Sequence, residues 1–124
     1  MTKNKENESK QLVDYVIEGI QEKKGSGIVV LNLSELENTI TNYFVICEGD
    51  SNVHVDAVAG SVEDYVRENA KEKPFRIEGK QNAQWIIIDY LDVVVHVFQK
   101  TTRNFYKLES LWADAQKTEI PNLF

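Results

Sequence analysis

The chain has little of the chemistry on which many enzyme and secreted-protein sites depend. Its 124 residues include one cysteine and two histidines. The lone Cys47 excludes an intrachain disulfide and lies in an apolar run, so we expect a buried thiol in a reducing compartment. No apolar run approaches the roughly 20 residues that cross a bilayer, and residues 1–10 lack the apolar core of a secretory signal. These absences predict a cytoplasmic protein.

Known catalytic and metal-binding patterns are also missing from the sequence. His54 is expected at the start of a helix, where Asp56 points to a different helix face, and His96 lies in a valine run. Both histidines are therefore expected to be structural, with no metal and no cofactor. There is no Gly-x-Ser-x-Gly elbow, no Walker loop and no Gly-x-Gly-x-x-Gly loop. The sequence predicts a protein that is not an enzyme.

Nucleotidyl transfer is the one enzymatic alternative. Gly49-Asp50-Ser51 follows a predicted strand, as the phosphate loop of nucleotidyltransferases does, and Glu63-Asp64 could imitate their metal-binding acidic pair. Two-metal catalysis needs carboxylates that converge on one point. Neighbouring residues of a helix instead diverge by about 100° around its axis. A nucleotidyltransferase-like enzyme with an unrecognised metal site therefore stays as the alternative function.

The charge balance is acidic, with 20 Asp and Glu against 14 Lys and Arg and a formal net charge of −6. A general nucleic-acid binder needs a basic face that replaces counterions, so no direct, sequence-specific nucleic-acid partner is expected. An acidic protein instead suits a basic partner, and ribosomal proteins are the commonest basic proteins of a cytoplasm.

The hydrophobic pattern predicts one α/β domain over residues 9–116, after a disordered polar tail at 1–8 and before a C-terminal tail at 117–124. Interleaved elements followed by three successive strands predict a mixed five-stranded sheet flanked by helices. The expected elements are a helix from Ser9 to Gly25, strands at 28–33 and 43–47, a short helical turn at 34–37, a helix across 55–66, an edge strand at 75–78, a hairpin at 84–98 and a helix across 105–115.

The joint of the predicted hairpin carries unusual side chains for a turn. Asp89, Tyr90 and Asp92 lie there, and Trp85 begins the first strand. Asp is common in turns, and Tyr90 could be a cross-strand packing residue, so a purely structural role is one interpretation. Trp and Tyr also dominate binding hot spots, and acidic groups steer basic partners. The residues alone leave both interpretations open.

The chain resembles the ribosomal silencing factor family, also called Iojap-like, from about Lys10 to Ala115. The resemblance implies a nucleotidyltransferase-like α/β fold without catalysis. Members of that family bind the large ribosomal subunit through the universal large-subunit protein number fourteen. They block the joining of the two subunits and repress translation when nutrients are scarce. The segments that carry the resemblance are Ile28–Leu33, Asn42–Gly49, Trp85–Tyr90, Asp92–Phe98 and Arg103–Trp112.

From the hairpin and the resemblance together, we expect the partner to contact Trp85, Asp89, Tyr90, Leu91 and Asp92. Leu91 stands where the family usually has Gly. A two-residue turn of type I′ or II′ would force a positive φ there, which Leu tolerates poorly. The turn is therefore of another type, or Leu91 is strained and presented outward as an extra apolar contact.

A second group is expected to be structural, namely His96, Tyr106, Leu108 and Trp112. A neutral His96 should hydrogen-bond a polar group of the C-terminal segment, with Tyr106 and Glu109 as the candidates. Leu108, Leu111 and Trp112 are expected to pack on the sheet of their own chain. A homodimer formed through the same C-terminal helix is the alternative.

Overall fold

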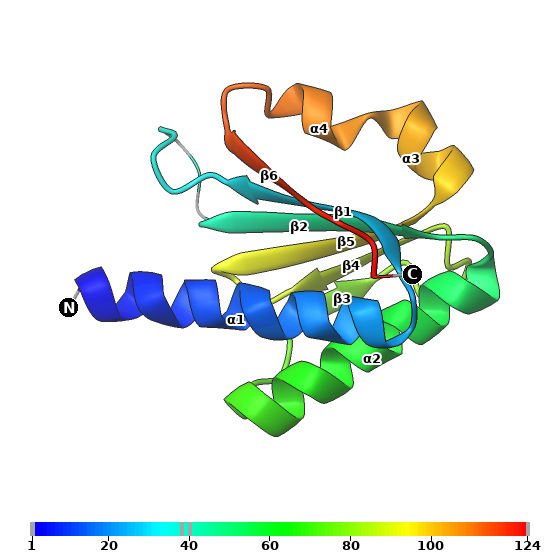
Figure 1. The fold of residues 1–124 in the computed structure, drawn as a ribbon, viewed down its shortest axis with the longest axis horizontal. Helices are drawn as coiled ribbons and strands as arrows, with labels where there is room; N and C mark the ends of the chain where they lie inside the picture. The colour runs from blue at the N-terminus through cyan, green and yellow to red at the C-terminus, as the bar shows by residue number, and fades with distance from the viewer. Residues whose placement is uncertain (1, 38, 40, 124) are drawn as a thin grey trace.

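The computed structural model describes residues 2–37, 39 and 41–123. Six strands form one sheet in the order β3-β4-β5-β2-β1-β6 (Figure 1). In this part of the chain β2 and β5 pair in parallel, and the other neighbouring strands pair antiparallel. The predicted mixed α/β class is confirmed, with six strands instead of five. The elements are α1 (Thr2–Glu22), β1 (Ser26–Asn32), β2 (Tyr43–Gly49), α2 (Asn52–Ala70), β3 (Arg76–Glu78), β4 (Trp85–Asp89), β5 (Val93–Gln99), α3 (Lys100–Tyr106), α4 (Leu108–Leu111) and β6 (Gln116–Ile120).

The sixth strand, β6, corrects the predicted C-terminal tail. It pairs antiparallel with β1, from Asn32 opposite Gln116 to Ile28 opposite Ile120. Residues 116–119 are exposed and polar, so the segment lacks the apolar run by which the other strands were recognised. Charged side chains on an edge strand also discourage pairing with another molecule. The prediction of a tail is therefore wrong for residues 117–120.

Both terminal helices differ from the prediction. Helix α1 begins at Thr2, so the predicted polar tail at 2–8 is helical here, which suits a segment containing Lys and Glu. The predicted helix at 105–115 is two short helices, α3 and α4, because Lys107 adopts a left-handed conformation with φ 49° between them. Residues 34–37 form turns and a bend instead of a short helix.

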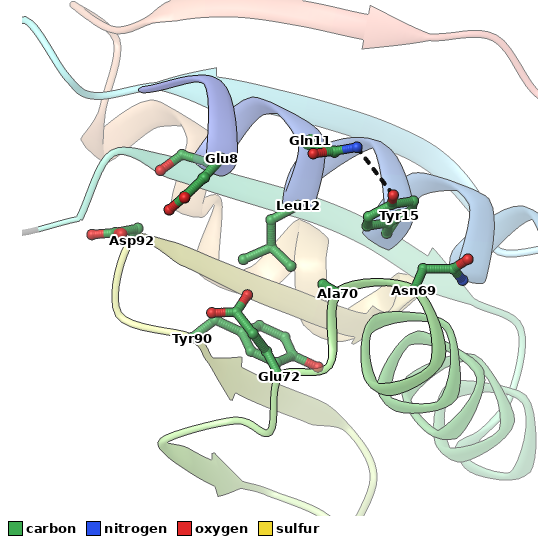
Figure 2. A pocket seen from close by; sticks show the side chains of 10 residues that line it. Glu8, Gln11, Leu12, Tyr15, Asn69, Ala70, Glu72, Tyr90 and Asp92 are labelled. Atoms are coloured by element: carbon green, nitrogen blue, oxygen red, sulfur yellow. Dashed lines mark hydrogen bonds between the residues drawn. The ribbon is translucent and has the colours of Figure 1, made fainter. Parts of the chain in front are cut away.

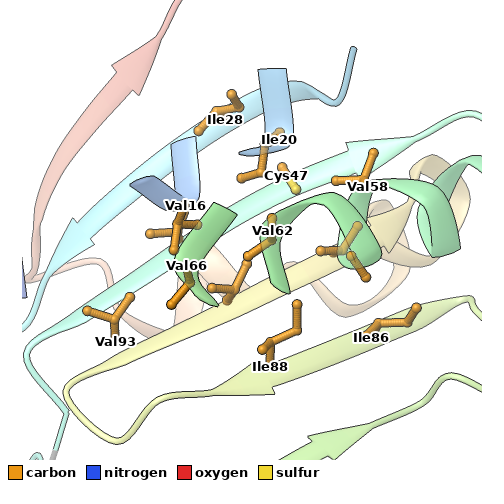
Figure 3. Packing of buried hydrophobic residues seen from close by; sticks show 14 of the residues in the cluster. Val16, Ile20, Ile28, Cys47, Val58, Val62, Val66, Ile86, Ile88 and Val93 are labelled. Carbon is orange, nitrogen blue, oxygen red and sulfur yellow. The ribbon is translucent and has the colours of Figure 1, made fainter. Parts of the chain in front are cut away.

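Helices α1 and α2 pack side by side over one face of the sheet and enclose the larger core (Figure 3). The predicted apolar stripe of α2 is buried there, which confirms the helical periodicity. Gly19 permits the close approach of the two helices, because a Cβ at this position would lie 2.9 Å from Val62 Cα. The core residues that Figure 3 labels are Val16, Ile20, Ile28, Cys47, Val58, Val62, Val66, Ile86, Ile88 and Val93.

Helices α3 and α4 lie on the opposite face and cover it only in part. A smaller cluster forms beneath them, in which Leu31, Ile46, Phe98 and Leu108 are buried. Side chains on the rest of this face, from β4 and β5, remain half-buried. This partly covered face of the sheet is therefore a candidate binding surface.

No helix in the described part of the chain is long and apolar enough to span a membrane.

Candidate docking surfaces

The alternation of side chains along β4 divides the predicted contact residues between the two faces of the sheet. Trp85 packs with the smaller cluster, on the α3 and α4 side, whereas Tyr90 is part of the core under α1 and α2. Asp89 shares the side of Trp85, because it lies four positions further along a strand whose side chains alternate between the two faces. The structure therefore places Trp85 and Tyr90 on opposite faces, not on one surface.

The half-buried side chains of the partly covered face form a continuous surface across three neighbouring strands. We call it the open face, and it consists of Phe44 on β2, Val94 on β5, and Trp85, Ile87 and Asp89 on β4. Phe44 lies beside Val94, and Val94 lies opposite Asp89. The backbone beneath this surface is hydrogen-bonded on both sides, so the surface is rigid. It is also mostly apolar, since Asp89 is its one charged member.

His96 lies under the open face and is 5% exposed. Trp85 Nε1 donates a hydrogen bond to His96 Nδ1 at 3.1 Å, so the proton of the neutral imidazole is on Nε2, which has no hydrogen-bond partner. Burial lowers the pKa of His96 from 6.5 to about 4. The hydrogen-bond partner of His96 is therefore Trp85, whereas the sequence predicted Tyr106 or Glu109.

Trp85 is held by its aromatic neighbours as well as by this hydrogen bond. Its ring stacks on Phe98, with centroids 4.8 Å apart, and meets Tyr106 at 5.0 Å. Tyr106 is exposed on its other side, so the pair forms the border between α3 and the open face. Trp85 thus combines a packing role with partial exposure toward a partner.

The turn between β4 and β5 has the hydrogen bonding of a γ-turn. The Asp92 N–H donates to the Tyr90 carbonyl at 3.0 Å, and Leu91 between them has φ 74°. Asp89 Oδ1 accepts the Leu91 N–H at 2.8 Å, and Asp89 also faces Arg76 at 3.6 Å. Leu91 is 55% exposed. The structure thus combines the two alternatives: the turn is of another type than I′ or II′, and Leu91 also has a positive φ and an exposed side chain.

Tyr90 and Asp92 line a groove on the other side of the turn, between α1, the end of α2 and the hairpin (Figure 2). Its volume is about 450 Å³. We call it the acidic groove, because Glu8, Glu72 and Asp92 line it and, among the side chains that the structure describes, no Lys, Arg or His does. Tyr90 is 7% exposed, and its hydroxyl has no hydrogen-bond partner. Burial, followed by the charges of Glu63 and Glu72, raises the pKa of the Tyr90 phenol.

The buried Arg103 is a structural residue that the sequence patterns did not single out. Its Nη1 donates to the Gly27 carbonyl at 2.6 Å and to Glu48 Oε1 at 3.0 Å, and its Nε donates to Glu109 Oε1 at 3.0 Å. These bonds join α3 to β1, β2 and α4. The glutamate that ends the apolar run of β2 was a signal, because a carboxylate in that position needs a cation.

His54 has a comparable linking role at the other end of the helical layer. Its Nδ1 accepts the Asp50 N–H at 3.0 Å, and its Nε2 lies 2.7 Å from the Lys23 carbonyl. The ring therefore donates through Nε2 and joins the end of α1 to the start of α2. The predicted structural role is consistent with this geometry.

The C-terminal residues predicted to be structural are placed at different depths. Leu108 is buried and Trp112 is half-buried, with its ring perpendicular to that of Phe44 at 5.6 Å. Both pack on the sheet of their own chain. Leu111 is 74% exposed, so the prediction that it packs on the sheet is wrong, and Phe105 is exposed as well. The homodimer stays a prediction.

The residues of the enzymatic alternative do not converge. Glu63 pairs with Lys80 at 2.9 Å, and Asp64 pairs with Arg67 at 2.8 Å. Within the described residues no three Asp, Glu, His or Cys side chains are grouped as metal ligands. Burial raises the pKa of the Cys47 thiol to about 12, which keeps it protonated and unreactive. Glu63 and Asp64 therefore do not form the convergent acidic pair that the enzymatic alternative requires.

The fold and these surfaces define a small α/β domain with a rigid, aromatic open face and an adjoining acidic groove. Residues 6–123 match the family described as "Ribosomal silencing factor during starvation", and the chain belongs to this family. The resemblance seen in the sequence is thereby confirmed, and the match includes β6.

Individual relatives agree with this membership. The protein named "Ribosomal silencing factor RsfS" in Halalkalibacterium halodurans is 37% identical over 112 residues, which cover 90% of this chain and 94% of that protein. The mouse protein named "Mitochondrial assembly of ribosomal large subunit protein 1" is 30% identical over 102 residues, 81% of this chain and 44% of that protein. A crystal structure of a Chromobacterium violaceum protein superposes with a TM-score of 0.79 at 33% identity, covering 84% of this chain and 85% of that one.

Proposed function

We propose that this protein is a non-enzymatic ribosomal silencing factor that binds the large ribosomal subunit, blocks its joining with the small subunit and represses translation under nutrient limitation. The observation that carries the proposal is family membership over residues 6–123. The mouse relative, which is named for assembly of the large ribosomal subunit, supports that subunit as the partner. Within the subunit we propose contact with the universal large-subunit protein number fourteen.

The open face and the neighbouring Leu91 are the proposed docking surface. Trp85, Ile87 and Val94 supply half-buried apolar area on a rigid backbone, so little ordering cost is incurred on binding. Leu91 extends this apolar area outward from the turn. The formal charge of −6 favours encounter with a basic ribosomal protein and makes the association rate depend on salt.

Silencing by this route requires only that a folded domain occupy space. A 14.2 kDa domain bound to the large-subunit surface that faces the small subunit would obstruct their contact without any chemical step. The separate ion pairs of Glu63 and Asp64 also support a role without catalysis.

The test uses dissociated ribosomal subunits and a matched pair of variants. Leu91→Asn removes the outward apolar side chain but suits the positive φ, so the variant should fold. Val53→Asn removes another exposed apolar side chain, on α2 and away from the open face. We expect wild type and Val53→Asn to be retained on large subunits and to inhibit subunit joining, with Leu91→Asn about fivefold weaker.

Retention on small subunits alone would overturn the proposal. Transfer of labelled nucleotide from a nucleoside triphosphate to an acceptor would overturn its non-enzymatic part.

A further inference from the structure

We propose that the acidic groove binds an arginine side chain of a basic protein partner. The inference rests on the proposed function, because the partner is a ribosomal protein, but the groove is a second contact, distinct from the open face. It adds a charge-specific contact beside an apolar one.

The first support is the charge of the groove. Glu8 belongs to α1, Glu72 follows α2, and Asp92 lies in the turn between β4 and β5, so three separate elements each bring a carboxylate to one groove. Among the residues whose side chains are described, from Glu8 onward, none makes an ion pair with any of the three carboxylates. No Lys, Arg or His of this set lines the groove. Three clustered carboxylates attract a cation and disfavour an anionic nucleic acid.

The second, independent support is the Tyr90 hydroxyl, which lacks a hydrogen-bond partner. Figure 2 shows the Tyr90 ring along the floor of the groove, with its hydroxyl directed toward the end near Ala70. The hydroxyl is buried and has no hydrogen-bond partner. Buried polar atoms in folded proteins are nearly always paired, and an unpaired one needs a reason. A donor that enters the groove would supply the missing bond.

The shape and lining of the groove favour arginine over a compact ammonium group. Leu12 and Tyr15 form an apolar and aromatic wall, against which the stem and planar face of arginine can pack. The guanidinium has five donors in a rigid fork, so one group can reach carboxylates and a hydroxyl on different walls. A lysine ammonium would concentrate its three donors at one point.

The position of the groove joins it to the proposed docking surface. Asp92 lines the groove, and its neighbour Leu91 extends outward from the same turn. One basic segment of a partner can therefore place an apolar residue near Leu91 and an arginine in the groove.

The test is a titration of the 124-residue chain, labelled with 15N, with argininamide. Citrullinamide is the uncharged control of similar shape. We expect argininamide to shift the amide signals of Tyr15, Asn69, Ala70 and Tyr90, and citrullinamide to leave them in place. Glu72→Gln should weaken argininamide about fivefold, while Glu68→Gln, an exposed acid of α2 outside the groove, should not.

Tyr90→Phe separates binding from packing. If the hydroxyl contacts the guanidinium, this variant binds argininamide more weakly although its melting temperature is unchanged or higher. Shifts spread evenly over all acidic surfaces, equal shifts with citrullinamide, or unchanged affinity in Glu72→Gln would each overturn the inference.

A second arm measures large-subunit binding by Glu72→Gln and by Glu68→Gln. We expect only the former to be weaker than wild type, and equal binding by both would also overturn the inference. If wild type itself is not retained on large subunits, the proposed function fails. The titration with argininamide is independent of ribosomes and so distinguishes the two failures.

Discussion

Replacing Trp85 distinguishes its hydrogen bond from its packing. Trp85→Phe keeps an aromatic ring against Phe98 but removes the Nε1–H, which leaves the buried Nδ1 of His96 without a donor. Leaving a buried acceptor unsatisfied costs about 1–3 kcal/mol. Full truncation of a core Trp costs about 3–5 kcal/mol. Because Trp85 is only half-buried, we expect about 2 kcal/mol for Trp85→Phe and about 4 kcal/mol for Trp85→Ala.

The assay is urea denaturation at neutral pH, which gives the free energy of unfolding. Trp112→Phe is the matched control, since Trp112 is half-buried on the same side of the sheet and its indole has no hydrogen bond to a described residue. We expect its cost to stay below about 1 kcal/mol. A Trp85→Phe variant as stable as Trp112→Phe would refute the hydrogen bond to His96. Binding to large ribosomal subunits should be compared between wild type and Trp85→Phe. Trp85→Ala is unsuitable for this comparison, because its loss of stability would also reduce binding.

Three further perturbations test other parts of the structure. Arg103→Met leaves Glu48 and Glu109 without their buried cation, and should lower the free energy of unfolding by about 3 kcal/mol in urea denaturation. A smaller loss than in Arg103→Lys would contradict the role of these ion pairs. Because the pKa of His96 is lowered to about 4, the unfolded chain binds a proton first as the pH falls. Stability should therefore decrease from about pH 6.5, by about 3 kcal/mol at pH 4, and His96→Gln should lack this component. Leu91→Gly relieves the positive φ and should raise the free energy of unfolding by about 1 kcal/mol, whereas destabilisation would show that Leu91 packs.

Sequence patterns predicted the elements that bury apolar residues at a regular spacing. Helix α2 repeats valine on one face, and the hairpin consists of two apolar runs, so both could be located from hydrophobicity alone. Strand β6 could not, because it is held largely by its backbone ladder with β1 and its residues 116–119 are polar and exposed. The interruption between α3 and α4 at Lys107 could not be predicted either, because no strong sequence signal marks a left-handed conformation at a lysine.

The candidate surfaces were harder to predict because they combine distant segments. Trp85 and Tyr90 are five positions apart, and side chains alternate along a strand. Their placement on opposite faces of the sheet could therefore have been predicted from the sequence. The contact of Trp85 with His96, by contrast, depends on the register of β4 against β5. The acidic groove brings together α1, the end of α2 and the hairpin turn. No local pattern contains such a juxtaposition.

The position of β6 beside β1 has a consequence for the order of folding. The helices and the hairpin form from contacts close in the chain, but the pairing of Ile28 with Ile120 closes a loop of roughly three-quarters of the chain. Closing long loops costs more chain entropy, so such pairings form late on the folding pathway. Its exposed polar side chains contribute little burial to hold it. We therefore expect the β1–β6 edge to assemble last in the sheet and to open first, so that amide hydrogen exchange of the native protein is fastest in this ladder.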